Sequence, residues 1–254
     1  MDLISCLFET NALKVSKYDK PFIYKNNDMG PYIYKMHHLF GSENAANKLL
    51  AYINDNKNDK QIFTIDLLKI IKEKYSTDSI YNYVINHIKE NILRLVDISK
   101  IDFISGGERR DWFFSLMIAN LLGKQHLTIY KDLDIMKFDF VGVQKVLNLH
   151  NASIMHITDN LVKGDTYKKF WLPATKKISG KIKWGFTVAN RMHAGDSVLK
   201  ENGIDSYSLI KIEQHFFDEV MKLGFIDKNQ YNMLIEFIEN EEKSKKNLKK
   251  MFYK

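Results

Sequence analysis

Residues 158–166 (TDNLVKGDT) form the short polar loop with the clearest potential for chemistry. An apolar run that predicts a β-strand precedes the loop, and a predicted helix follows it. Gly164 permits a tight turn, so that successive backbone N–H groups can point at a phosphate at the positive end of the helix. Asp165 and Thr166 can orient around that anion, while Asp159 can bind ribose hydroxyls or reach a magnesium ion through water. Strand, glycine turn and helix also occur together without a ligand, so both interpretations stay open.

Short apolar runs that alternate with helical segments must position this loop. The runs predict strands at residues 101–105, 126–130, 153–158, 182–189 and 207–212. Amphipathic helices are predicted to begin at Ser42, at Thr64 and at Thr77 or Asp78. The alternation indicates βαβ units and an α/β fold with a mainly parallel sheet flanked by helices. In such a sheet ligands bind at the carboxyl ends of the strands, where this loop lies.

The length and composition of the chain favour one large domain. It has 254 residues, of which 45% are hydrophobic, enough for a substantial core. We divide it into an N-terminal hood with helices (1–95), a parallel-sheet core (96–215) and C-terminal helices (216–254). The single cysteine, Cys6, excludes an internal disulfide, and the first residues lack the pattern of a secretory signal. No apolar run is long enough to span a bilayer, so we expect a cytoplasmic protein with no membrane partner.

The net charge of +7 indicates an anionic partner. Lysines between residues 243 and 254 carry much of the surplus, and we interpret them as the solvated face of a terminal helix. Few aromatic residues accompany them and no nucleic-acid-binding module is recognisable, so we do not expect nucleic acid as a partner. The histidines show no metal-binding spacing, which argues against a protein metal site. A nucleotide or pyrophosphate ligand fits the charge.

Residues 153–167 (SIMHITDNLVKGDTY) resemble the phosphoribosyl pyrophosphate signature of type I phosphoribosyltransferases. That signature has four apolar residues, two acids, two mostly apolar positions and then T-T-G-x-T. Asp159 matches the second acid, whereas Thr158 stands in place of the first and Val162 replaces the first threonine. The phosphate loop then consists of Lys163, Gly164, Asp165 and Thr166. The resemblance implies that these residues hold the ribose and its 5′-phosphate, with Lys163 adding a positive charge.

Residues 101–123 (IDFISGGERRDWFFSLMIANLLG) resemble the strand, pyrophosphate loop and following helix of orotate phosphoribosyltransferases. The resemblance implies that Gly106 and Gly107 let the backbone approach the ligand. Arg109 and Arg110 would then neutralise a pyrophosphate. Without a strand before them and a helix after them, the two arginines would instead belong to a solvated turn.

Two further segments resemble the base-binding parts of the same family. Residues 21–35 (PFIYKNNDMGPYIYK) are similar to the N-terminal stretch that covers the base, which implies that Lys25 and Tyr32 face it. Residues 186–212 (FTVANRMHAGDSVLKENGIDSYSLIKI) are similar to a V-V-D-R-x-E-G-G segment, with Arg191 on the arginine that contacts orotate. A guanidinium fork suits a pyrimidine that carries a carboxylate.

The mobile catalytic loop is the poorest match to the family. Its R-K-E-x-K-x-H-G motif follows the second strand, where residues 130–142 read YKDLDIMKFDFVG. Lys131 matches the basic position, Asp132 the acid and Lys137 the loop lysine, while the histidine is missing. The resemblance therefore predicts Lys137 and Asp159 as catalytic residues, with an altered loop, and Lys131 as a ligand of phosphoribosyl pyrophosphate.

The resemblance implies transfer of the phosphoribosyl group from phosphoribosyl pyrophosphate to a nitrogen of orotate, with release of pyrophosphate, in pyrimidine nucleotide biosynthesis. Magnesium would enter bound to phosphoribosyl pyrophosphate, and a homodimer is expected because family members are usually dimers. Two alternatives stay open. A non-catalytic sensor of phosphoribosyl pyrophosphate or a nucleotide, signalling through the basic C-terminal region, is favoured by Thr158 and the altered loop. Arg191, by contrast, favours an enzyme, because a sensor would have little use for a base pocket. The second alternative is a phosphoribosyltransferase that acts on another base.

Overall fold

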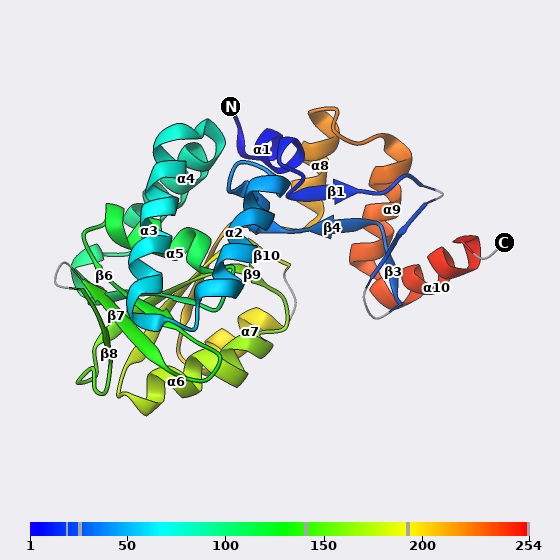
Figure 1. The fold of residues 1–254 in the computed structure, drawn as a ribbon. Coiled ribbons are helices and arrows are strands. Elements are labelled where there is room, and N and C mark those ends of the chain that lie inside the picture. Colours follow the sequence, from blue (N-terminus) through cyan, green and yellow to red (C-terminus); the bar gives the residue numbers. More distant parts are fainter. Residues whose placement is uncertain (19, 25–26, 140–141, 192–193, 253–254) are drawn as a thin grey trace.

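The structure is a computed structural model that describes residues 1–18, 20–24, 27–139, 142–191 and 194–252 (Figure 1). Within these residues the central sheet contains seven strands, β5 (Phe103–Gly107), β6 (Gln125–Ile129), β7 (Ile135–Asp139), β8 (Gly142–Lys145), β9 (Ser153–Leu161), β10 (Lys181–Asn190) and β11 (Asp205–Lys211). Their order is β11-β10-β9-β5-β6-β7-β8. The strands from β11 to β6 run parallel, and β7 and β8 continue the sheet antiparallel. The predicted α/β fold with a mainly parallel sheet is confirmed.

Helices cover both faces of the sheet (Figure 1). One face carries α2 (Glu43–Asn56), α3 (Lys60–Thr77), α4 (Ser79–Leu95) and α5 (Trp112–Leu121), and a short 3-10 helix, Ile98–Lys100, leads into β5. The opposite face carries a π-helical turn, Tyr167–Trp171, followed by α6 (Leu172–Lys177) and α7 (Gly195–Glu201). Parallel strands are buried by helices on both sides, which explains why β9 is almost entirely buried.

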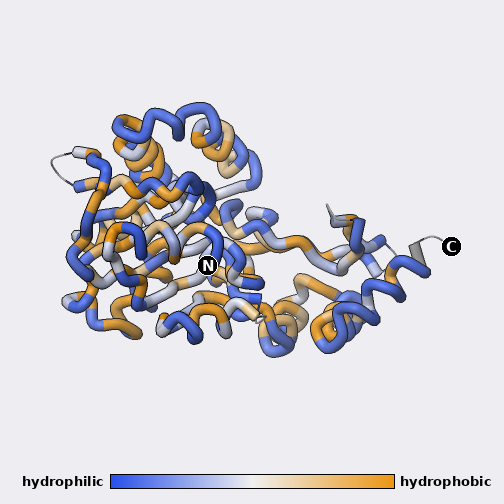
Figure 2. Tube along the Cα trace, turned by 90° about the horizontal axis from the view of Figure 1, so that it is seen from below, coloured by the Kyte–Doolittle hydropathy of each residue, from blue (hydrophilic) through white to orange (hydrophobic). Residues whose placement is uncertain are grey.

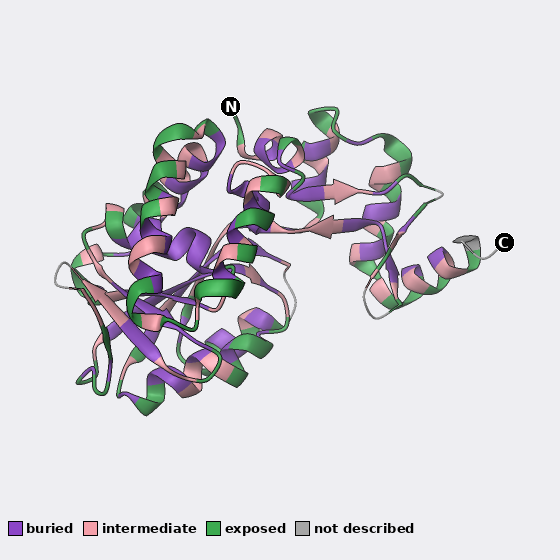
Figure 3. Cartoon of the chain, viewed as in Figure 1, coloured by how far each residue is buried: buried purple, intermediate pink, exposed green. Residues whose placement is uncertain are grey.

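Each face has its own hydrophobic cluster, and the buried residues follow the strands and the inner sides of the helices (Figures 2 and 3). The larger cluster surrounds α5, whose aromatic residues Trp112, Phe113 and Phe114 are fully buried. The smaller cluster packs Tyr167 and Trp171 against the other face. Helix α5 is apolar on all sides because the sheet and other helices enclose it.

The helix starts on the first face were predicted in part. Ser42 caps α2, its hydroxyl accepting from the Ala45 N–H at 3.1 Å, and Asp78 caps α4. The predicted start at Thr64 is wrong, because Asp59 caps α3 one turn earlier and Thr64 is buried inside the helix.

The N-terminal part and the C-terminal part of the chain pack against each other beside the sheet (Figure 1). The N-terminal part contains α1 (Leu3–Glu9), the paired strands β1 (Leu13–Val15) and β4 (Tyr32–Tyr34), the paired strands β2 (Phe22–Ile23) and β3 (Met29–Gly30), and a 3-10 helix, Met36–Leu39. The C-terminal part contains α8 (Gln214–Lys222), α9 (Lys228–Glu239) and α10 (Glu241–Phe252). Helix α10 contacts β3, where Asp28 pairs with Lys245 at 3.3 Å and with Lys249 at 3.0 Å. Among the described helices, none combines the length and the apolar character needed to cross a membrane.

Candidate functional site

A polar pocket of about 460 Å³ opens at the carboxyl ends of β5, β6 and β9. It gathers six residues that the sequence placed in a ligand site, namely Arg109, Arg110, Lys131, Thr158, Asp159 and Thr166. Thr158 and Asp159 lie near the end of β9, and the other four residues lie in the loops that follow β5, β6 and β9. They meet because the three strands are neighbours and parallel. The pocket therefore has the position that a parallel α/β sheet gives to its ligand.

The loop after β9 forms one side of the pocket. Gly164 has a φ of +71°, so the tight turn predicted there exists and favours glycine. A Cβ at this position would also lie 2.9 Å from the Cβ of Val198. Thr166 lines the pocket, whereas Lys163 and Asp165 are exposed in the same loop and do not line it. The junction thus stands open beside a hollow large enough for an anion.

The loop after β5 forms the opposite side. The two glycines that end β5 fit against side chains: a Cβ on Gly106 would lie 2.1 Å from the Ser115 hydroxyl oxygen, and one on Gly107 would lie 2.1 Å from the Trp171 ring. The structure thus gives both glycines a packing role, and neither of them lines the pocket, so their approach to a ligand stays a prediction. Close packing of the loop on α5 and on the π-helical turn fixes the place from which the arginines extend.

Two carboxyl groups, those of Asp111 and Asp159, lie buried where these two sides meet. Asp111 accepts hydrogen bonds from the Thr158 hydroxyl at 2.9 Å, the Asp159 N–H at 3.0 Å and the Gly107 N–H at 3.1 Å. Burial and the nearby Asp111 carboxylate raise the pKa of Asp159 to about 7, against the opposing effect of Arg110. The pocket therefore contains a carboxyl whose pKa is raised by burial and by a second carboxylate.

The end of helix α2 supports the loop after β5 from outside. The Lys57 ammonium contacts the Glu108 carboxylate, and Arg109 donates to the Asn54 side chain. The second Glu108 oxygen accepts from the Lys131 N–H at 3.1 Å. Salt bridging and hydrogen bonding hold the pKa of Glu108 below its usual range despite the burial of its carboxyl group. Glu108 therefore links α2, the loop after β5 and the loop after β6.

The loop after β6 is a tight turn, which corrects the expected mobile catalytic loop. Residues 130–134 close it, with the Tyr130 N–H donating to the Asp134 carbonyl at 2.9 Å. Lys131 lines the pocket, but Lys137 lies in the middle of β7 and pairs with Asp139 at 3.1 Å. Lys137 therefore lies on a strand and borders a different hollow. The short β-hairpin was missed because its sequence was aligned to a loop motif.

The residues predicted to bind a base lie beside the pocket. The Arg191 Nε donates to the Tyr32 hydroxyl at 2.9 Å, and an Arg191 Nη lies 3.3 Å from a Glu241 carboxylate oxygen on α10. The guanidinium also lies over the rings of Tyr32 and Phe237, 5.5 and 5.8 Å from their centroids. Tyr34, two residues further along the same strand, lines the pocket itself. The predicted base ligand Lys25 lies outside the described residues.

Comparison with known proteins rests on structure, since no protein-family profile and no curated protein matches the sequence. UMP synthase of Leishmania donovani matches with a TM-score of 0.61 and 12% identity, over 93% of this chain and 41% of that chain. Orotate phosphoribosyltransferase of Francisella tularensis matches with a TM-score of 0.59 and 12% identity, over 92% of this chain and 96% of that chain. Orotate phosphoribosyltransferase of Aeropyrum pernix matches with a TM-score of 0.57 and 13% identity, over 89% of this chain and 100% of that chain. The chain has the type I phosphoribosyltransferase fold.

Within this phosphoribosyltransferase fold the pocket also contains residues that sequence reasoning missed, namely Tyr34, Glu108, Asp111, Asn160, Val162 and Trp171. Glu108 and Asp111 stand on either side of the two arginines, and this adjacency in the sequence is the signal that could have found them. Tyr34 belongs to the N-terminal stretch that was expected to cover a base. Trp171 lies four residues beyond the segment 153–167 that resembles the signature, and only its large size in a short helix distinguishes it.

Proposed function

We propose that the protein transfers the phosphoribosyl group of phosphoribosyl pyrophosphate to a nitrogen of orotate and releases pyrophosphate. The observation that carries the proposal is the arrangement of the polar pocket. Arg110 and Lys131 line it together with Asp159 and Thr166, beside the turn at Gly164. A ligand with a phosphate at one end and a pyrophosphate at the other matches this distribution of charge.

The arrangement suits the charges that develop in the reaction. As the bond from C1 of the ribose to pyrophosphate breaks, positive charge grows on the sugar and negative charge on the leaving group. Arg110 and Lys131 would stabilise the pyrophosphate, while Asp159 would hold the ribose hydroxyls and face the sugar cation. Backbone N–H groups around Gly164 would bind the 5′-phosphate. No side chain needs to form a covalent bond.

Magnesium belongs to the proposal as a companion of phosphoribosyl pyrophosphate. The described residues include no cluster of three or more His, Cys, Asp or Glu that would bind a metal alone. The pocket does offer oxygen atoms of the kind that magnesium accepts, in the Asp159 carboxyl and the Asn160 side-chain oxygen, which has no hydrogen-bond partner among the described residues. Bound there, magnesium would neutralise charge on the pyrophosphate.

Arg191 is the residue we propose for recognition of the base. Tyr32 and Glu241 already orient its guanidinium, which leaves further N–H donors for a carboxylate. A carboxylate-bearing pyrimidine would share or replace the contact with Glu241. A homodimer is part of the proposal, since a second subunit would help to exclude water above a pocket whose own β6 loop is a short turn.

The tight turn after β6 favours a second candidate, a non-catalytic sensor of phosphoribosyl pyrophosphate. Turnover needs water to be excluded, usually by a closing loop, whereas binding alone does not. Residues 130–134 are too few to fold over the pocket.

A coupled assay for pyrophosphate release separates the candidates. Wild-type protein with magnesium, phosphoribosyl pyrophosphate and orotate should turn over, and Arg191→Ala should lower kcat/KM for orotate by roughly 30- to 100-fold, as expected for a charged hydrogen-bonded pair. Uracil and other bases test the alternative acceptor. Binding of phosphoribosyl pyrophosphate without turnover on any base would support the sensor, and absence of both binding and turnover would reject both functions.

A further inference from the structure

Asp111 connects the two sides of the pocket through a single carboxylate. It stands directly before α5, where an aspartate usually caps its own helix, yet its side chain makes no capping hydrogen bond. One oxygen instead accepts from the Thr158 hydroxyl and the Asp159 N–H on β9, and the other accepts from the Gly107 N–H at the end of β5. Only 5% of Asp111 is exposed.

The Asp111 carboxylate bridges β5 and β9 at the point where backbone pairing between these two strands ends. The pairing of β5 with β9 ends at Ser105 and His156, and beyond this point β5 pairs only with β6 on its other side. The two strand ends separate here, and the pocket opens between the loops that follow them. The Asp111 carboxylate therefore joins the strands across a gap that no ladder hydrogen bond crosses.

We propose that Asp111 is a positioning residue that fixes the spacing between the pyrophosphate side and the ribose phosphate side of the pocket. The inference rests on the proposed function for the identity of the ligand. Both Asp111 oxygens are already engaged by donors of the chain itself, so Asp111 acts through the loop and the strand tip. A ligand that reaches both sides gains from their correct separation, because the second contact is then intramolecular. A ligand that touches one side gains nothing from it.

Asp111→Asn tests this role with little change in size. The amide oxygen can still accept from Thr158 and Asp159, but the NH₂ group would face the Gly107 N–H, donor against donor. The matched control is Asp102→Asn. The Asp102 carboxylate accepts from the Ser153 N–H at 2.7 Å. This contact joins the same two strands, β5 and β9, at their amino ends.

Titration calorimetry with magnesium measures three probes: phosphoribosyl pyrophosphate, pyrophosphate alone and ribose 5-phosphate alone. For Asp111→Asn we expect affinity for phosphoribosyl pyrophosphate to fall about 10-fold or more, and affinity for each smaller probe to fall less than about 3-fold. Asp102→Asn should leave all three affinities within about 2-fold of wild type. A merely structural Asp111 would weaken all three probes alike.

Equal losses on the three probes, or unchanged affinity for phosphoribosyl pyrophosphate, would overturn the inference. If Asp111→Asn does not fold by circular dichroism, Thr158→Val decides by the same comparison, because it removes one donor to Asp111 and keeps the link to Gly107. Thr158→Val should weaken phosphoribosyl pyrophosphate selectively, by about 3-fold or more. Wild-type protein that binds none of the probes would instead reject the proposed function.

Discussion

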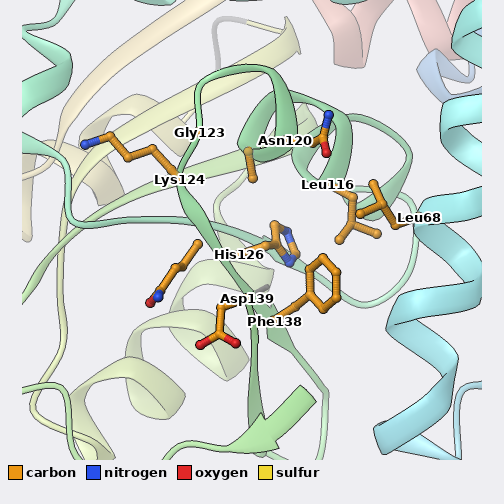
Figure 4. A pocket seen from close by; sticks show the side chains of 10 residues that line it. Leu68, Leu116, Asn120, Gly123, Lys124, His126, Phe138 and Asp139 are labelled. Carbon is orange, nitrogen blue, oxygen red and sulfur yellow. The ribbon is translucent and has the colours of Figure 1, made fainter. Parts of the chain in front are cut away.

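Two hollows lie at opposite ends of the parallel strands, and they differ in size and in the charged groups that line them. The pocket at the amino end of β6 has a volume of about 50 Å³, space for only a few water molecules. Leu68, Leu116 and Phe138 line it together with polar residues that include Lys124 and Asp139 (Figure 4). The pocket at the carboxyl ends has about 460 Å³ and is lined by arginine, lysine and carboxyl groups. Only the second is large and charged enough for a nucleotide-sized anion.

The buried ionisable groups of the two hollows differ in the same way. At the amino end, His126 is bonded to the Ser115 and Thr128 hydroxyls at 2.9 and 3.1 Å, and burial lowers its pKa to about 3. At the carboxyl ends, burial raises the pKa of Asp159 to about 7. His126 is neutral and satisfied inside the protein, whereas Asp159 is next to cations that face an open pocket. Of the two hollows, only the one at the carboxyl ends combines a buried ionisable group with cations that a ligand can reach.

The largest expected effect concerns Asp159 and pH. A carboxyl pKa raised from about 3.9 to about 7 means that the folded protein binds the proton more tightly than the unfolded chain, so this contribution is present at low pH and is lost as pH rises from about 4 to 7. Asp159→Asn should abolish this loss. We expect the variant, without ligand, to gain roughly 2–4 kcal/mol in unfolding free energy relative to wild type between pH 4 and 8.

Urea unfolding at several pH values measures this difference. A gap between the two proteins that stays constant with pH would mean that Asp159 is not protonated in the folded state, and the contrast with His126 would then lose its basis.

A somewhat smaller effect is expected at the other hollow. His126→Ala removes two buried hydrogen bonds and leaves a cavity, so the unfolding free energy should fall by about 2–3 kcal/mol. Binding of phosphoribosyl pyrophosphate by the folded variant should match wild type. Lys124→Ala, on the rim of the same hollow, is the control and should change stability by less than about 0.5 kcal/mol. A selective loss of ligand affinity in His126→Ala would break the distinction between the two hollows.

The smallest of the three effects in free energy is expected from Arg110→Ala, and it should appear in binding alone. Loss of a charge-assisted contact to pyrophosphate should weaken phosphoribosyl pyrophosphate by roughly 10- to 100-fold, or about 1.4–2.7 kcal/mol. Stability should hardly change because Arg110 is exposed. Arg94→Ala on α4, an exposed arginine hydrogen-bonded to Asn91, provides the matched control for charge. Equal affinities in the two variants would remove Arg110 from the site.

Much of the fold was predictable because its signals are local. Apolar runs and caps such as Ser42 and Asp78 depend on neighbouring residues, and parallel strands necessarily bring their exit loops to one edge. The glycine turn at Gly164 was predictable for the same reason. The sequence alone therefore predicts that the pocket lies at the strand-exit loops.

The contacts within the site depend on residues far apart in the chain, and these were not predictable. Asp111 meets Thr158 across 47 positions, and nothing near Asp111 in the sequence indicates that its side chain turns away from its own helix. The pairing of Arg191 with Glu241 depends on where α10 docks. Lys137 was misplaced because a loop motif was aligned to a region that pairs as a β-hairpin.

Calorimetric titration of magnesium and phosphoribosyl pyrophosphate into the wild-type protein tests the central claim most directly. The account predicts saturable binding of one molecule per chain, weakened by added pyrophosphate, which would compete for the arginine side of the pocket. Absence of binding at millimolar ligand, with the protein folded, would contradict it.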